Sequence, residues 1–288
     1  MKLKELCKKT LKFIFAKPPV LVTANVVTLA PSEMLQGRFA LITGGTSGIG
    51  YAIAKAFLAA GASVCITSRN EEKLQKACLQ LQTGHSDYHN RIFGRVLDNQ
   101  NVSSFKIVIN DILQKKGTID ILVNNAGVLG GSFPNAKEED FDTVIDTNLK
   151  GVFFLSQLIG TYMKENGIKG NILNIASSSS LRPAASAYTL SKWGIRGLTM
   201  GLAKSLAPYN ITVNGVAPGP TVTPMLIQGN SNNIAHHGLP AGRYAMPEEI
   251  ANMAVFLVSD MGRMVMGDII YMTGGAGLLT YDDLGYGF

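Results

Sequence analysis

The chain has 288 residues, of which 46% are apolar, and its formal net charge is +6. This length and apolar content are enough to bury the core of one large domain or two small ones, and they exclude a disordered or collagen-like chain. The three cysteines, Cys7, Cys65 and Cys78, lack C-x-x-C spacing and support neither a disulfide framework nor a structural zinc site, which favours a reducing, cytoplasmic location.

The positive charge is concentrated at the start of the chain. Residues 1–17 contain six lysines and one glutamate, a net charge of +5, so the other 271 residues carry only +1. No nucleic-acid-binding module with interleaved aromatic residues follows, and we expect no nucleic-acid partner. Lys12, Lys17 and two prolines interrupt the apolar run, and no small-residue cleavage site stands out, which argues against an export signal.

Residues 1–36 are expected to form a basic and apolar extension ahead of the main domain. Two interpretations stay open for residues 2–16: a basic amphipathic helix that lies on an anionic membrane or a partner, with residues 1–17 as a peripheral membrane contact, or a solvated tail. Residues 20–30 are an apolar run of 11, too short to span a bilayer. We expect them to pack on the domain or on a neighbouring subunit.

From Arg38 onward, short apolar runs alternate with longer amphipathic segments, a pattern that predicts alternating strands and helices. The expected strands are residues 39–43, 63–68, 90–96, 121–125, 170–176, 211–216 and 268–272. The expected helical segments are residues 48–60, 71–82, 102–115, 137–166, 187–208 and 247–258. Seven strands with six intervening helical segments predict an α/β fold with one doubly wound parallel sheet, covered by helices on both faces.

Residues 43–50, Thr-Gly-Gly-Thr-Ser-Gly-Ile-Gly, join the first expected strand to the first helix. Gly44 allows a tight turn, Gly48 lets backbone N–H groups approach a pyrophosphate, and Gly50 permits close contact of the helix, whose N-terminus adds partial positive charge. The G-x-x-x-G-x-G spacing differs from the usual dinucleotide fingerprint, so an ordinary glycine-rich loop is the alternative. The position directly after the first strand favours a nucleotide site.

Four further motifs follow in chain order: Asn124-Asn125-Ala126-Gly127, Asn148, a serine cluster that starts at Ser177, and Tyr188-x-x-x-Lys192. Together with the glycine turn they resemble the classical short-chain dehydrogenase/reductase (SDR) family over residues 37–275, with Pro218-Gly219 and residues 247–251 included. The resemblance implies a Rossmann-type fold, a nicotinamide cofactor, and a homodimer or homotetramer. Residues 276–288 form a C-terminal tail that either folds over a neighbouring active site or trails.

Tyr188 and Lys192 are four residues apart, so on a helix they share a face, and the ammonium favours the tyrosinate. A phenol with a pKa of about 10 is otherwise a poor acid or base near neutral pH. We therefore predict Tyr188 as general acid/base and Lys192 as its activator, which by resemblance also holds the nicotinamide ribose. A plain Tyr/Lys pair on a helix surface is the alternative.

Ser177 is expected to donate a hydrogen bond to the substrate oxygen as charge develops there. The segment from Ser177 to Tyr188 is two residues shorter than is common in the family, so Ser178 and Ser179 are the alternatives. Asn148 resembles the fourth catalytic residue of the family, which holds a water in a proton relay. Its alternative role is to satisfy helix backbone groups.

Arg69 directly follows the second expected strand, and no acidic residue comes after it until Glu71. An acidic residue here suits NAD, whereas an arginine accommodates the extra phosphate of NADP, so NADP(H) is favoured and NAD(H) is the alternative. Ser47 stands where NADP users of the family often carry a basic residue, which leaves one charge in support. The resemblance assigns the cofactor contacts to Gly44, Thr46, Ser47, Gly48, Ile49, Gly50, Ser68, Arg69, Asp98, Asn99, Asn125, Ala126, Gly127, Tyr188, Lys192, Pro218, Gly219, Thr221 and Thr223.

The remaining polar residues suggest no other chemistry. His85, His89, His236 and His237 fall in no metal-ligand spacing, so we expect no metal, and the nucleophile elbow of a serine hydrolase is absent. The long irregular stretch of residues 218–246 is typical of a lid or binding loop. Within it, Met225, Leu226, Ile227 and Leu239 are expected to make the substrate pocket moderately apolar.

We therefore expect an NAD(P)(H)-dependent oxidoreductase of the SDR type that reduces a small-molecule carbonyl or oxidises an alcohol by hydride transfer, with catalytic Asn148, Ser177, Tyr188 and Lys192. Two alternatives stay open. The first is a β-ketoacyl carrier or CoA thioester reductase. The second is a cofactor-binding scaffold, docked to a membrane or partner through residues 1–36.

Overall fold

The computed structural model describes residues 33–225 and 233–278. Seven strands form one sheet in the order β3-β2-β1-β4-β5-β6-β7, and every neighbouring pair is parallel. The predicted doubly wound α/β fold is confirmed. The strands are β1 (Phe39–Thr43), β2 (Ser63–Ser68), β3 (Ile92–Val96), β4 (Ile121–Asn124), β5 (Asn171–Ile175), β6 (Thr212–Pro218) and β7 (Ile269–Met272).

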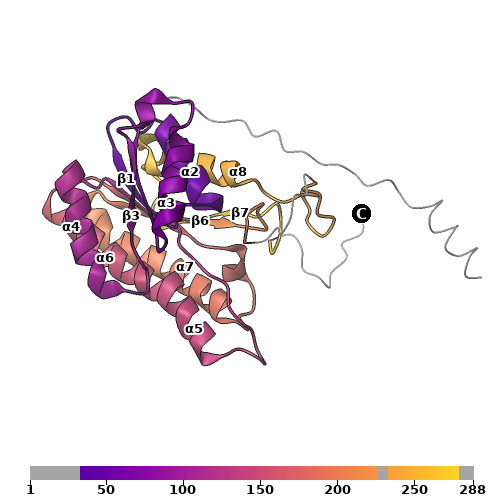
Figure 1. Ribbon diagram of the computed structural model, residues 1–288. Helices are drawn as coiled ribbons and strands as arrows, with labels where there is room; N and C mark the ends of the chain where they lie inside the picture. Colours follow the sequence, from indigo (N-terminus) through magenta and orange to yellow (C-terminus); the bar gives the residue numbers. More distant parts are fainter. Residues whose placement is uncertain (1–32, 226–232, 279–288) are drawn as a thin grey trace, which may run out of the picture.

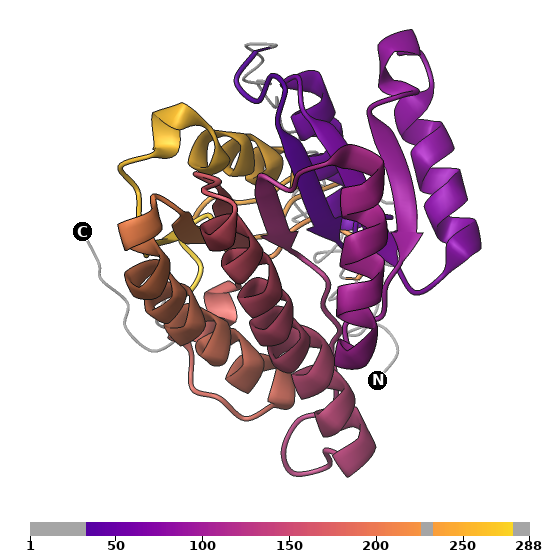
Figure 2. The same cartoon turned by 90° about the vertical axis from the view of Figure 1, so that its left-hand side faces the viewer.

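Helices cover both faces of this sheet (Figure 1). One layer, on a core of its own, contains α2 (Gly48–Ala59), α3 (Glu71–Gln82) and α8 (Pro247–Val258). The other layer, which faces the viewer in Figure 2, contains α4 (Phe105–Lys116), α6 (Gly151–Glu165) and α7 (Ala187–Leu206). The inner strands β1, β4 and β5 are fully buried between these layers, which explains their almost continuous apolar sequences.

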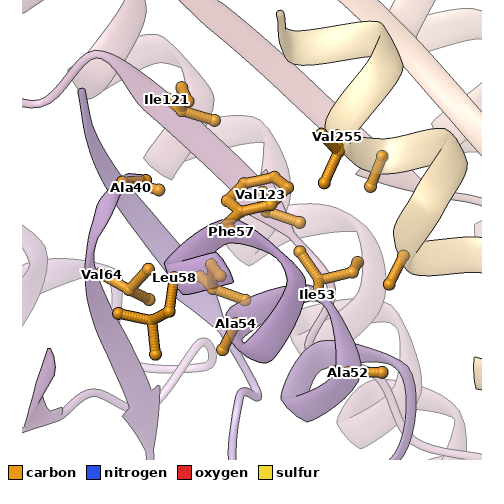
Figure 3. Packing of buried hydrophobic residues seen from close by; sticks show 14 of the residues in the cluster. Ala40, Ala52, Ile53, Ala54, Phe57, Leu58, Val64, Ile121, Val123 and Val255 are labelled. Atoms are coloured by element: carbon orange, nitrogen blue, oxygen red, sulfur yellow. The ribbon is translucent and has the colours of Figure 1, made fainter. Parts of the chain in front are cut away.

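The packing of α2 shows how the first layer is held (Figure 3). Ile53, Phe57 and Leu58 of α2 are fully buried and belong to the same cluster as Val123 of β4 and Val255 of α8. Burying a side chain of this size contributes about 1.5–3 kcal/mol. The start of α2, which carries the glycine turn, is therefore fixed to the sheet by packing further along the helix.

The long helical segment predicted for residues 137–166 consists of three parts. α5 (Glu138–Ile145) is followed by a π-helical turn, Asp146–Lys150, and then by α6. Directly after the π-helical turn, the backbone of Gly151 passes so close to the Asn99 carbonyl oxygen that a Cβ at this position would collide with it. The segment predicted to start at Val102 begins with a 3₁₀ turn, Val102–Ser104, before α4.

The packed fold takes in Leu35, two residues before the expected start of the domain at residue 37. The proposed amphipathic helix of residues 2–16, the apolar run of residues 20–30 and residues 279–288 of the tail lie outside the described residues. Within residues 33–225 and 233–278, no helix is long and apolar enough to cross a bilayer.

The chain order of the strands places a crevice at one edge of the sheet. β1 pairs with β2 on one side and with β4 on the other. The chain leaves β1 into α2 on one face, whereas α4, which leads into β4, lies on the opposite face. In open α/β sheets this reversal leaves a crevice outside the carboxyl ends of the strands, where ligands bind.

Candidate active site

A cavity of about 990 Å³ opens at the carboxyl ends of the strands. It is lined by most of the residues that the sequence motifs single out, which come from turns after β1, β2, β3, β4, β5 and β6 and from the start of α7. Two of the predicted site residues, Gly50 and Asn148, do not line it. The lining includes Gly44, Thr46, Ser47, Gly48, Ile49, Ser68, Arg69, Asp98, Asn99, Asn125, Ala126, Gly127, Ser177, Tyr188, Lys192, Pro218, Gly219, Thr221 and Thr223.

The glycine turn has the geometry of an anion site. Gly44 and Gly48 adopt φ values of +65° and +56°, which disfavour side chains. Ser47 is the N-cap of α2, but its side chain makes no capping hydrogen bond, and the first turn of α2 carries no acidic residue. The N–H groups at this helix end are therefore available to a phosphate, as a helix N-terminus in a dinucleotide site requires.

Asn125 fixes the glycine turn to the end of β4. Its Nδ2 donates to the carbonyl oxygens of Thr43 (2.9 Å) and Gly44 (3.0 Å), while Thr43 Oγ1 accepts from the backbone N–H groups of Asn125 (3.0 Å) and Ala126 (3.1 Å). Gly50 does not line the cavity, so its contact with the cofactor stays a prediction, whereas the close contact of the helix expected at Gly50 is present. A Cβ there would lie 2.5 Å from the Gly44 oxygen and closer still to Asn125 Nδ2.

Gly45 does not line the cavity, but the turn needs a glycine there, which the sequence analysis did not single out. A Cβ at this position would lie 2.5 Å from Cγ2 of Ile66 on the neighbouring strand β2. The turn can pass this close to β2 only without a side chain. The sequence shows a second glycine directly after Gly44, but it does not indicate which contact requires a glycine there.

Ser177 and Tyr188 meet at the catalytic end of the cavity. Ser177 follows β5, is 8% exposed, and caps the 3₁₀ turn Ser178–Leu181 by accepting a 3.1 Å hydrogen bond from Ser179 N. Its side chain interacts with that of Tyr188 and lowers the pKa of the phenol. This interaction favours Ser177 over Ser178 and Ser179, although all three line the cavity.

Lys192 lies one helical turn behind Tyr188 and is 5% exposed. Its Nζ donates a 2.8 Å hydrogen bond to the Ile175 carbonyl oxygen and lies 5.6 Å from the centre of the Tyr188 ring. Burial lowers the pKa of Lys192 to about 8. Burial also raises the pKa of Tyr188, and the interaction with Ser177 opposes this rise. The expected activation of Tyr188 by Lys192 stays a prediction.

Asn148 sits in the π-helical turn and is 1% exposed. Its Oδ1 accepts from Val128 N (2.8 Å), and its Nδ2 donates to Val128 O (2.9 Å) and to Ser191 Oγ (3.3 Å). The side chain thus joins the loop after β4 to α7, and it satisfies backbone of another segment rather than of its own helix. Asn148 stands behind the cavity as a positioning residue.

The opposite end of the cavity suits a nucleoside. Asn99 is 4% exposed, and its Nδ2 has no hydrogen-bond partner among the described residues. A buried, unpaired amide donor is costly, so a ligand acceptor at this point would satisfy it. Asp98 is held by its Oδ1, which accepts from Gln100 N at 3.0 Å. The residues present therefore fit a dinucleotide that extends from Asn99 to Tyr188.

Helix α3 adds cavity residues that the motifs did not identify. Lys73, Lys76 and Gln80 line the cavity together with Arg69. Their spacing of three and four residues places them on one face of α3. That spacing was present in the sequence, but lysines on a polar helix face usually point into solvent.

The loop after β6 contributes less than expected. Met225 lines the cavity, whereas Leu239 is buried and does not, which corrects its assignment to the pocket. Leu226 and Ile227 lie outside the described residues. Val128, Leu129 and Met225 supply apolar surface near the catalytic end.

The fold and the cavity together define a nucleotide-dependent oxidoreductase, and comparison with known proteins agrees. A family model described as enoyl-(acyl carrier protein) reductase matches residues 44–277. The 3α-hydroxysteroid dehydrogenase of Mediterraneibacter gnavus is 38% identical over 248 residues, which cover 84% of this chain and 98% of that protein. The 3-oxoacyl-(acyl-carrier-protein) reductase FabG of Thermotoga maritima is 37% identical over 246 residues, with the same coverage.

Two solved structures share the fold. The 3-ketoacyl-(acyl-carrier-protein) reductase of Brucella melitensis, complexed with NADH, has a TM-score of 0.76 at 29% identity and covers 85% of this chain and 100% of its own. A short-chain dehydrogenase of Burkholderia cenocepacia, in complex with NADP, has a TM-score of 0.75 at 31% identity and covers 84% of this chain and 98% of its own.

The chain belongs to the short-chain dehydrogenase/reductase family. It is an oxidoreductase that acts on CH–OH or C=O groups of a small molecule and uses a nicotinamide nucleotide.

Proposed function

We propose that this enzyme is an NADP(H)-dependent carbonyl reductase in which Tyr188 is the proton donor. The observation that carries the proposal is that Ser177 and Tyr188 line one cavity, with Lys192 buried one helical turn from Tyr188 and bonded to Ile175. Burial raises the pKa of Tyr188, so the phenol is protonated at neutral pH and carries the proton that the carbonyl oxygen receives. A protonated acid at this point suits reduction of a carbonyl.

In this mechanism the hydroxyls of Ser177 and Tyr188 both hydrogen-bond the substrate carbonyl oxygen. Ser177 stabilises the negative charge that develops there, and Tyr188 transfers its proton to the oxygen. A bound nicotinamide supplies the hydride for the carbonyl carbon. Lys192, fixed by Ile175, stabilises the resulting tyrosinate, and Asn148 holds the Val128 loop against α7.

The test is Tyr188→Phe, with Tyr209→Phe on an exposed 3₁₀ turn as the matched control. Loss of a general acid lowers kcat by about 10²–10⁴-fold. We expect that loss at Tyr188, an unchanged dissociation constant for the cofactor, and full activity in the control. Turnover by Tyr188→Phe equal to that of the wild type would exclude the proton-donor role.

The preference for NADP(H) rests on three cations at the nucleoside end. Arg69, Lys73 and Lys76 line the cavity, and none of them forms an ion pair with another described residue. The cavity residues at this end include one acid, Asp98. Three cations near a single carboxylate favour a ligand with an additional phosphate, which a guanidinium can bind in bidentate fashion.

Titration of NADPH and NADH into purified protein tests this preference. We expect Arg69→Ala to weaken NADPH about tenfold to hundredfold, since hydrogen bonds to charged groups contribute about 1.5–3 kcal/mol, and to leave NADH unchanged. Lys73→Ala and Lys76→Ala have smaller effects of the same kind. Lys55→Ala, on exposed surface of α2, is the control. Equal losses for both nucleotides in Arg69→Ala would refute a phosphate-specific site.

An exposed apolar surface on α5, α6 and α7 supports a homodimer. Phe153 and Phe154 of α6 are 45% and 40% exposed, and Trp193 and Met200 of α7 are also exposed. Contiguous apolar surface of this kind is typical of subunit contacts. Sedimentation of the wild type should give a dimer or larger, and Phe154→Lys should dissociate it. Leu79→Lys, at an exposed position on α3, should not, and a monomeric wild type contradicts the proposal.

A further inference from the structure

One cation at the catalytic end of the cavity has no part in the proposed mechanism. Among the charged residues that line the cavity, Arg69, Lys73, Lys76 and Asp98 come from β2, α3 and the turn after β3. The charged lining residues near Ser177 and Tyr188 are Lys192 and Arg182. Since Lys192 is buried and bonded to Ile175, the charge of Arg182 is the one available to a substrate.

The backbone of Arg182 is held from both sides, which fixes the point from which its side chain extends. Its N–H donates to the Ser179 carbonyl oxygen at 3.2 Å, and its carbonyl oxygen accepts a 2.9 Å hydrogen bond from Trp193 Nε1 of α7. The same turn carries Ser177, so the guanidinium and the catalytic serine belong to one rigid segment.

The guanidinium itself lies beside Gly277, a glycine with φ of +74°. A Cβ at Gly277 would stand 3.4 Å from Nε and 3.8 Å from Nη2 of Arg182, so the guanidinium lies at about van der Waals distance from this glycine position. Within the described residues, Arg182 forms no ion pair. No acidic side chain of the described residues lines the catalytic end of the cavity, so nothing there repels an anion.

We propose that Arg182 binds an anionic group of the substrate and that the enzyme reduces carbonyl compounds with an apolar body and a carboxylate or phosphate. This inference rests on the proposed carbonyl reduction. Guanidinium binds either anion through two parallel hydrogen bonds. Val128, Leu129 and Met225 supply the apolar surface between the anion and the carbonyl. Arg182 thus selects oxo acids and oxo phosphates over neutral ketones.

The experiment uses the full chain with NADPH and matched probes. Pyruvate, acetoacetate and levulinate are compared with their methyl esters, so that charge changes while the distance between carbonyl and carboxylate increases along the series. Dihydroxyacetone phosphate against dihydroxyacetone distinguishes phosphate from carboxylate. The variants are Arg182→Gln, Arg182→Lys and, as the control, Arg196→Gln, whose guanidinium lies 5.5 Å from the Trp193 ring on α7.

We expect the wild type to reduce an anionic probe with the higher kcat/KM. Arg182→Gln should lower kcat/KM for that probe about tenfold to hundredfold, mainly through KM, and leave the neutral partner unchanged. Arg182→Lys should restore part of the loss, and Arg196→Gln should match the wild type. Asp282→Asn with Asp283→Asn, which neutralises two acids of the tail, should leave the preference for the anion intact.

Equal kcat/KM for the anionic and neutral partners in the wild type would overturn the assignment of Arg182. So would a loss in Arg182→Gln that is the same for both partners, because that result indicates a structural role in the turn. Either result leaves carbonyl reduction standing. Failure of the wild type to reduce any probe of either kind would instead count against the proposed function.

Discussion

Replacing Gly50 by alanine is expected to destabilise the glycine turn although residue 50 does not touch the cavity. In a helix, alanine is favoured over glycine by about 1 kcal/mol, so helix propensity alone predicts stabilisation. The structure predicts the opposite, because the new Cβ would lie 2.5 Å from the Gly44 carbonyl oxygen and even closer to Asn125 Nδ2.

The size of the effect follows from what Asn125 must give up. If its side chain moves away from the Cβ, the hydrogen bonds of Nδ2 to Thr43 O and Gly44 O are lost, at about 1 kcal/mol each. Overpacking adds about 1–3 kcal/mol. After the gain in helix propensity is subtracted, Gly50→Ala should lower the free energy of unfolding by about 2–4 kcal/mol and weaken cofactor binding.

A double-mutant cycle with Asn125→Ala tests this reasoning by urea unfolding. Asn125→Ala already removes both hydrogen bonds and the side chain that Gly50→Ala would displace. In the Asn125→Ala variant, Gly50→Ala should therefore lower the free energy of unfolding by about 1–2 kcal/mol less than it does in the wild type. Additive effects of the two substitutions would refute the steric coupling, and a stabilising Gly50→Ala would show that helix propensity outweighs the contact.

Three further outcomes are expected. The pKa of Lys192 in the folded protein is about 8, below its ordinary value of 10.5, so the unfolded chain binds more protons between those values and stability rises with pH across this window, by about 3 kcal/mol in total. Lys192→Met should remove that rise from urea unfolding curves, and an unchanged pH dependence would contradict the burial argument. Asn148→Ala leaves N–H and C=O of Val128 without their partner, and it should lower the free energy of unfolding by about 2–4 kcal/mol and reduce kcat, with full kcat as the contrary result. Asn171→Ala removes a hydrogen-bond acceptor that lies 2.6 Å from Arg38 Nη2, at the opposite end of the sheet from the cavity. It should lower the free energy of unfolding by about 2–3 kcal/mol and leave the dissociation constant of the cofactor unchanged. A changed dissociation constant would show coupling across the sheet.

The strands were the most predictable part of the fold. The prediction for residues 39–43 matches the bounds of β1, and the others agree within two residues, because strands buried on both faces have short apolar runs bounded by turn residues. The π-helical turn could not be predicted in this way. The apolar period continues through residues 137–166, and the interruption coincides with a tertiary contact, the approach of Gly151 to Asn99.

The sequence predicted those site residues whose chemistry requires a particular residue type. It did not predict those whose role depends on the direction in which the side chain points. The motifs identified Ser177, Tyr188 and Lys192. They did not show that Asn148 bonds the backbone of Val128 and does not line the cavity, because the sequence does not give the side-chain direction within a π-helical turn. The position of Arg182 could not be predicted for a similar reason. A 3₁₀ turn and the loop after it have no periodicity that indicates which side chains face the cavity.

The π-helical turn also affects how α6 is rotated about its axis relative to α5. An α-helix advances about 100° per residue, so one inserted residue would rotate α6 by that angle relative to α5. A π-helical turn holds one residue more than an α-helical turn and takes up the insertion without that rotation. Phe153 and Phe154 therefore stay on the exposed surface, and Leu155 stays fully buried in the core. The extra residue thus lets one continuous stretch of chain place Asn148 against the Val128 loop and keep an apolar face on the outside.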